Sequence, residues 1–183
     1  QLIKSGEFNA HTELVTSTII QDLGPEFSDG PQIPTSQHFW FNAAKAPLDD
    51  VKVRQALSYT FPYQVFIDTA LEGYATQSRG LIPTGMFGYD AAATQYTYDI
   101  DKAKSLLAEA GVAEGLELTM TYATGDTVEQ AAGELWKAEL AKVGITLNLQ
   151  PMSWEAQWDL GKGDPANAQD IFLLLYWPTY SDA

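Results

Sequence analysis

The chain has 183 residues, of which 45% are hydrophobic and 19% charged, a composition typical of an ordinary globular domain. Ten Lys and Arg residues against 24 Asp and Glu give a formal net charge of −14, which argues against nucleic acid and anionic membranes as partners, since both need a basic face. With no cysteine, the sequence excludes thiol nucleophiles, cysteine-ligated zinc, iron–sulfur clusters and disulfides, and no apolar run approaches the roughly 18 residues that span a bilayer.

Residues 1–34 have the least regular pattern and are predicted to be a connecting segment before a main domain at 35–183. Residues 14–20 are apolar and β-branched, which fits either a strand or a buried helical turn. Glycine and proline then punctuate residues 24–36 as a loop. Because the chain starts without Met and ends in an aromatic-rich stretch, we expect it to be a piece of a longer protein.

A strand and two helices are predicted between residues 39 and 73. Residues 39–42 have the aromatic content of a strand. Asp49 or Asp50 caps a helix whose apolar positions recur at spacings of three and four, as expected for Val53, Ala56, Leu57, Thr60 and Phe61. A second helix starts at Pro62 and stops at Gly73.

Residues 74–98 are predicted to be a long irregular segment, of a length usually found in functional or crossing loops. Asp99 then caps a third helix that closes at Gly111. Its inward positions are Ile100, Ala103, Leu106, Leu107 and Ala110.

The last third has the clearest pattern. Residues 116–122 alternate as a strand, residues 127–143 form an amphipathic helix, and residues 145–149 form a second strand, which together predict a parallel crossover. The buried positions of the helix are predicted to be Val128, Ala131, Leu135, Leu140 and Val143. A short helix at 153–160 and a buried strand at 171–176 complete a mixed α/β fold, a sheet flanked by helices.

Motifs for catalysis are nearly absent from the sequence. His11 and His38 lie far apart without metal-ligand spacing, and a structural or surface role is the favoured interpretation for each. Acidic residues at helix starts offset the positive end of the helix dipole. Glu129, Glu134 and Glu139 are predicted to lie on or near the solvated side of one helix rather than to form an acid–base pair.

The aromatic residues are more informative. The chain has five Trp, nine Tyr and eight Phe, and several fall at the ends of predicted strands or in the loops after them: Tyr122, Trp154, Tyr176, Trp177 and Tyr180. In an open α/β sheet, ligands gather beyond the carboxyl ends of the strands. These rings are therefore either a surface that stacks on a sugar or grips a side chain, or aromatic residues of the domain's own core and rim.

A series of motifs in the middle of the chain resembles the extracytoplasmic solute-binding proteins of ABC importers, the family that includes the dipeptide-, oligopeptide- and nickel-binding proteins. In order, the matching stretches are Phe41-Asn42, Pro47 to Tyr59, Leu71 to Ala75, Leu81-Ile82-Pro83, Tyr98 to Gly111 and Gly144-Ile145. Each piece is weak alone, and the order and gaps together are specific over residues 37–183.

The resemblance implies one lobe of a bilobal fold of the type II periplasmic-binding-protein kind. Residues 35–183 correspond to the second large lobe, residues 1–34 to the end of the first lobe, and the rest of that lobe is missing. The resemblance also implies that a ligand, a peptide or an oligosaccharide, is captured by hinge closure and delivered to a membrane ABC permease. It implies an extracytoplasmic or periplasmic location, and leaves open whether a lipid anchor holds the full-length protein. It implies no catalysis, no cofactor and no metal. The ligand-binding residues implied are Tyr122, Thr124, Trp154, Trp177, Thr179 and Tyr180.

One departure from the family bears on the ligand. Peptide-binding members carry an Asp two or three residues after the Trp that Trp177 matches, where it pairs with the α-ammonium of the peptide. Thr179 and Tyr180 occupy those positions and Asp182 follows, which slightly favours a neutral ligand such as an oligosaccharide over a peptide. Two other classes stay open: a carbohydrate-active enzyme domain with an aromatic cleft, and an interaction domain whose acidic face docks a basic partner.

Overall fold

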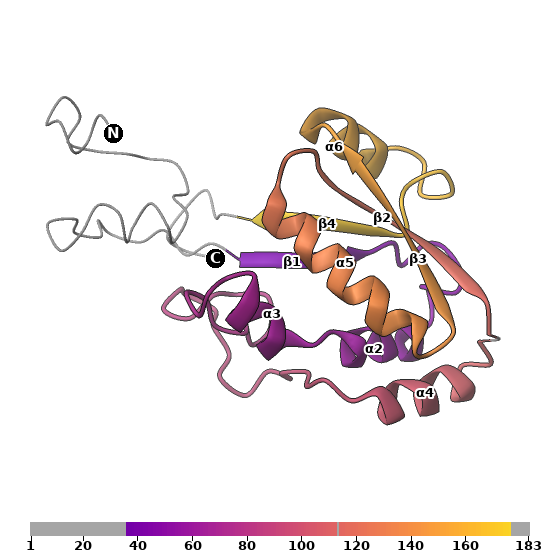
Figure 1. Cartoon of the computed structure of the whole chain (residues 1–183), viewed down its shortest axis with the longest axis horizontal. Helices are drawn as coiled ribbons and strands as arrows, with labels where there is room; N and C mark the ends of the chain where they lie inside the picture. Colours follow the sequence, from indigo (N-terminus) through magenta and orange to yellow (C-terminus); the bar gives the residue numbers. More distant parts are fainter. Residues whose placement is uncertain (1–35, 113, 177–183) are drawn as a thin grey trace, which may run out of the picture. The chain divides into compact units, whose positions relative to one another are not determined.

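The computed structural model describes residues 36–112 and 114–176, so the predicted connecting segment at 1–34 lies outside the described residues. Within this part, the elements follow in the order β1 (Ser36–Phe41), α2 (Val51–Thr60), α3 (Tyr63–Thr69), α4 (Ile100–Glu109), β2 (Leu116–Ala123), α5 (Thr127–Ala141), β3 (Ile145–Met152), α6 (Trp154–Lys162) and β4 (Ile171–Tyr176). Figure 1 shows α5 running across the sheet, with α2 and α4 beyond it.

The strands form one sheet in the order β1-β4-β2-β3. β2 pairs in parallel with β3 over its whole length, and Met120 and Thr121 of β2 pair in parallel with Ile171 and Phe172 of β4. β1 runs antiparallel to β4. The predicted mixed α/β sheet is therefore confirmed, and α5 is the crossover between the two parallel strands β2 and β3.

The hydrophobic core lies on one face of this sheet, under α2, α4 and α5. Alternate residues of β2, β3 and β4 point into it because side chains alternate along a strand. These are Leu118, Met120 and Tyr122, then Ile145 and Leu147, then Ile171 and Leu173. At its centre, Trp136 of α5 is 1% exposed and donates from Nε1 to Thr60 Oγ1 at 2.7 Å.

Helix starts follow the predicted caps. Asp50 accepts from Lys52 N, and Asp99 accepts from Lys102 N, so both carboxylates satisfy free N–H groups of a first turn. Gly111 follows α4 with a φ of +69°, which is the left-handed conformation expected of a stop. The second helix differs from the prediction: α3 ends at Thr69 rather than continuing to Gly73.

The buried side of α5 differs more. The buried residues are Glu129, Ala132, Gly133, Trp136 and Leu140, so only Leu140 of the predicted set is fully buried. Val128, Ala131, Leu135 and Val143 are partly buried and pack at the edge of the core. The buried face of α5 is rotated relative to the predicted one because the helix contacts the sheet closely at Gly133, where an added Cβ would lie 2.7 Å from Met120 Cε. This rotation brings Trp136 inward.

Candidate functional site

The face of the sheet opposite the core carries exposed aromatic residues. Trp40 of β1 is directly across from Phe172 of β4, and Phe172 is across from Thr121 of β2. These residues alternate with the core-facing ones along their strands, so they share the second face. The helix α6 packs against β2 on that side. We call Trp40, Trp154, Trp158 and Phe172 the aromatic face.

The helix α6 orients two of these rings. Ser153 caps it by accepting from Ala156 N, which starts the helix directly after β3. Trp154 and Trp158 then lie one turn apart and stack, with ring centroids 5.6 Å apart and planes at 21°. Both rings approach Phe172, and they remain 41% and 43% exposed. A planar or apolar ligand group has open ring surface here on which to pack.

Beneath α6 lies a layer of polar side chains that is unusual for a buried position. Gln157 is fully buried on the sheet side of the helix, and neither polar atom of its side-chain amide has a partner among the described residues. Thr121 Oγ1 and Gln169 Oε1 are buried without partners as well, although Gln169 Nε2 donates to Gln157 O at 3.4 Å. This polar layer lies between the sheet and the helix that carries Trp154 and Trp158.

The loop after β2 lies beside the start of α6. Thr124 is exposed, and its N–H donates to Met152 O at 2.8 Å at the end of β3. Trp154 follows Met152 by two residues. The structure therefore brings two of the predicted residues, Thr124 and Trp154, to the same end of the sheet, beyond the carboxyl ends of parallel strands.

A buried carboxylate fixes this end of the sheet. Glu129, in the first turn of α5, is 4% exposed and accepts from Ala123 N at 2.7 Å. The Gln37 side chain and the Leu175 backbone also lie close enough to favour the charged carboxylate, so residues of β2, β1 and β4 surround Glu129. Burial raises the pKa of Glu129, and the charge of Asp126 raises it further. The prediction that Glu129 lies on the solvated side of the helix was wrong, since the close helix–sheet contact turns it inward.

The remaining predicted residues divide into two groups. Tyr122 is 7% exposed and belongs to the core, on the opposite face of the sheet from Trp154, because it is one residue out of phase with Thr121. It therefore offers little surface to a ligand. Trp177, Thr179 and Tyr180 lie outside the described residues. Sequence reasoning missed Trp158, whose spacing of four residues from Trp154 was the available signal.

His38 has a structural environment, in line with its favoured interpretation. It is hydrogen-bonded to Ser36 Oγ at 2.8 Å and packs edge-on against Trp40, and burial lowers its pKa. His11 lies outside the described residues. Across residues 36–112 and 114–176, no group of three His, Asp or Glu side chains is arranged to hold a metal ion. Over the same ranges, none of the helices has the length and apolarity needed to cross a bilayer.

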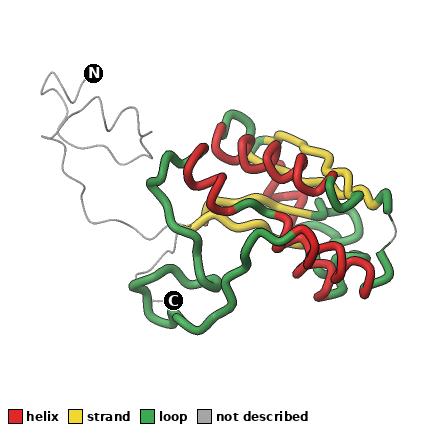
Figure 2. Tube along the Cα trace, turned by 60° about the horizontal axis from the view of Figure 1, so that its bottom comes forward, coloured by secondary structure: helices red, strands yellow, loops and turns green. Residues whose placement is uncertain are grey.

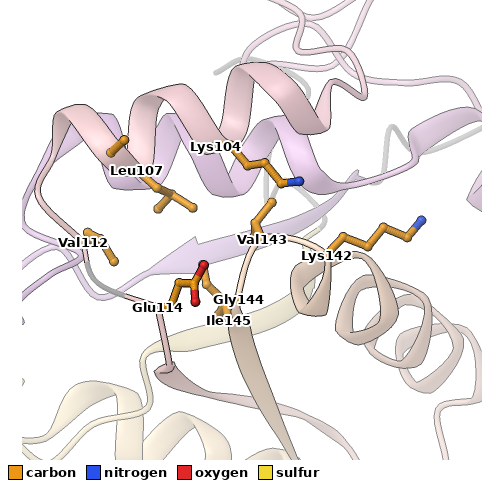
Figure 3. Close-up of a pocket in the computed structure, with 9 residues that line it drawn as sticks. Lys104, Leu107, Val112, Glu114, Lys142, Val143, Gly144 and Ile145 are labelled. Carbon is orange, nitrogen blue, oxygen red and sulfur yellow. The ribbon is translucent and has the colours of Figure 1, made fainter.

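A pocket of about 350 Å³ lies elsewhere, between α4 and the turn from α5 to β3 (Figure 3). Lys142 at its rim is held by Glu139 Oε2 at 2.7 Å and also contacts the Tyr98 hydroxyl, so its charge is already paired. None of the predicted ligand residues lines this pocket.

Comparison with known proteins identifies the family. Residues 1–183 match the family model described as "Bacterial extracellular solute-binding proteins, family 5 Middle". The chain belongs to this family, which confirms the resemblance found in the sequence.

Individual relatives agree with that assignment. The dipeptide-binding protein of Escherichia coli strain K12 is 36% identical over 118 residues, covering 62% of this chain and 22% of the relative. The probable D,D-dipeptide-binding periplasmic protein DdpA of the same strain is 33% identical over 146 residues, covering 79% of the chain and 27% of the relative.

A solved structure shows the same fold. The periplasmic binding protein DppA of Helicobacter pylori, in complex with the peptide STSA, superposes with a TM-score of 0.76 at 22% identity. The match covers 99% of this chain and 35% of that protein. The chain thus spans only about a quarter of the curated relatives and a third of this structure.

Proposed function

We propose that this chain is one lobe of an extracytoplasmic solute receptor, which captures a small ligand by hinge closure and presents it to an ABC permease for import. The observation that supports this most is the open aromatic face formed by α6 and β4, at 41% and 43% exposure of Trp154 and Trp158. An isolated core would bury such rings. In a receptor lobe, exposed rings contact a ligand that is held between this lobe and a second one.

A peptide is the first candidate ligand. Two relatives are named as dipeptide-binding proteins, and the Helicobacter pylori structure holds a peptide. The rings of Trp154 and Trp158 suit a peptide side chain, while exposed backbone and hydroxyl groups near Thr124 suit its polar main chain. Thr179 and Tyr180 replace the expected Asp, so we propose recognition that does not depend on a free α-ammonium.

A neutral oligosaccharide is the second candidate, supported by the same two residues and by the stacked rings, since sugar faces pack on tryptophan. An enzymatic role receives less support: the relatives are named for binding, and the rings rather than a carboxylate pair dominate the described site. The periplasmic name of one relative supports an extracytoplasmic location.

Calorimetry on the full-length protein tests the proposal. Tetrapeptides with free and N-acetylated termini, and a neutral oligosaccharide, are titrated in turn. We expect submicromolar peptide binding that acetylation weakens by less than about tenfold, or 1.4 kcal/mol. Trp154→Ala should weaken binding by at least the same factor, whereas Tyr98→Ala, at 42% exposure beside α4, should leave it unchanged. Binding of neither ligand class by the full-length protein would overturn the proposal.

A further inference from the structure

The long segment between α3 and α4 has an organised shape. Its two limbs are joined by side chains: Gln77 donates to Tyr96 O, while Gln95 donates to Gln77 O at 2.9 Å. Arg79 adds bonds to Ala93 O at 2.9 Å and to Gln95 Oε1 at 3.0 Å. The segment is therefore an Ω-type loop with a braced neck, and its tip is residues 81–92.

The neck is also fixed to the lobe. Tyr96 packs edge-on against Tyr59 of α2, with ring centroids 5.2 Å apart. Gly80 lies so close to the returning limb that an added Cβ would be 3.2 Å from Ala93 Cβ. Met86 in the tip is 7% exposed, and its backbone closes two turns, donating to Pro83 O and accepting from Tyr89 N, each at 3.2 Å. The tip is thus held in one orientation rather than left as a free excursion of the chain.

What this braced loop presents to its surroundings is apolar. Leu81 is 63% exposed and Phe87 is 74% exposed, and Tyr74 just before the neck is 62% exposed. These are the three most exposed large hydrophobic residues in the part of the chain that the structure describes. Asp90 is the single charged residue of the tip, in a chain with a net charge of −14. Apolar side chains held in solvent contribute no burial energy, so an ordered apolar patch of this kind marks a surface that another surface covers.

The position of the loop indicates what covers it. In Figures 1 and 2 the loop lies at the end of the lobe where β1 begins and β4 ends, which is where the backbone enters and leaves. The relatives are about four times as long as their matched segment, so most of the full-length polypeptide lies outside this chain. A second copy is a poorer occupant, because two chains of charge −14 repel each other.

We propose that the tip at residues 81–92 is a docking surface, and that its occupant is an apolar region of the same full-length protein outside residues 1–183. Leu81 and Phe87 are the anchors of this contact. The loop then fixes how the lobe is seated on the remainder of the polypeptide, a role separate from ligand capture at the aromatic face.

Thermal unfolding of the full-length protein and of this chain, both without ligand, tests the proposal. Phe87→Ser and Leu81→Ser should each lower the Tm of the full-length protein by at least about 2 °C and leave that of the chain unchanged within about 1 °C. Val51→Ser, at 53% exposure at the start of α2, is the matched control and should change neither. An equal effect in both proteins, or none in either, would overturn the proposal.

Hydrogen exchange supplies a second readout that needs no substitution. Backbone amides of residues 81–92 should exchange at least tenfold more slowly in the full-length protein than in the chain. Equal exchange would contradict docking. A concentration-dependent dimer of the chain that Phe87→Ser abolishes would instead assign the surface to a second copy. Neither readout depends on ligand binding, so failure here is distinct from failure of the proposed receptor function.

Discussion

Replacing Glu129 by Ala should destabilise the domain, because it removes a buried hydrogen-bond acceptor. The carboxylate accepts from Ala123 N at 2.7 Å, at one end of the sheet. A buried N–H left without a partner costs about 1–3 kcal/mol. With this donor left unpaired, we expect a loss of about 1–3 kcal/mol in the free energy of unfolding, measured by urea denaturation.

The pH dependence of the Glu129→Gln variant separates the charge from the hydrogen bonds. Burial raises the folded-state pKa of Glu129 above its unfolded value near 4.5, so the folded state binds the proton more tightly. The stability of the unmodified protein therefore falls as the pH rises from the unfolded pKa through the folded one. Gln keeps an acceptor without the charge, so its stability relative to Glu should rise across this window and then become constant.

Glu134→Ala is the matched control, because Glu134 is an exposed glutamate on the same helix. It should change the free energy of unfolding by less than about 0.5 kcal/mol. If Glu129→Gln instead loses stability relative to the unmodified protein between pH 4 and 7, the buried carboxylate is stabilised in its charged form. The account of this end of the sheet would then be refuted.

Three further substitutions test the packing. Thr60→Val leaves Trp136 Nε1 without its 2.7 Å acceptor and should cost about 1–3 kcal/mol in chemical denaturation, with Ser58→Ala as a less buried control. Thr121→Val removes a buried hydroxyl without a partner, so it should raise the free energy of unfolding by up to about 1 kcal/mol and raise the Tm with it. A lower Tm would mean that the hydroxyl is bonded to water. Asp126→Ala removes the cap that accepts from Val128 N and Glu129 N and should cost about 0.5–2 kcal/mol, which Asp126→Ser should largely restore.

Local signals in the sequence were enough to place most of the elements, although α3 ends before Gly73 and β1 begins at Ser36, before the predicted 39–42. The caps Asp50 and Asp99 and the stop at Gly111 act within one or two turns, so their positions could be predicted without tertiary contacts. The alternation of residues 116–122 likewise predicted β2, and the strand–helix–strand spacing predicted its parallel pairing with β3.

The buried face of α5 could not be predicted in the same way. Glu129 is charged and Trp136 is large, so hydrophobic periodicity does not predict that either is buried. Both are buried because Gly133 lets the helix approach Met120 and Leu149 closely. Helix rotation is decided by that contact and not by periodicity. The candidate site shows the same limit: Tyr122 lies near the end of β2 and Trp154 just after β3, yet sheet alternation places Tyr122 on the other face.

Ligand affinity of the full-length protein compared with that of this chain alone is the most direct measurement of the receptor account. Titration of both with the same peptide, followed by calorimetry, should give submicromolar binding for the full-length protein and binding at least a hundredfold weaker for the chain, because the chain lacks the second wall of the proposed enclosure. Submicromolar binding by the chain itself would contradict capture between two lobes.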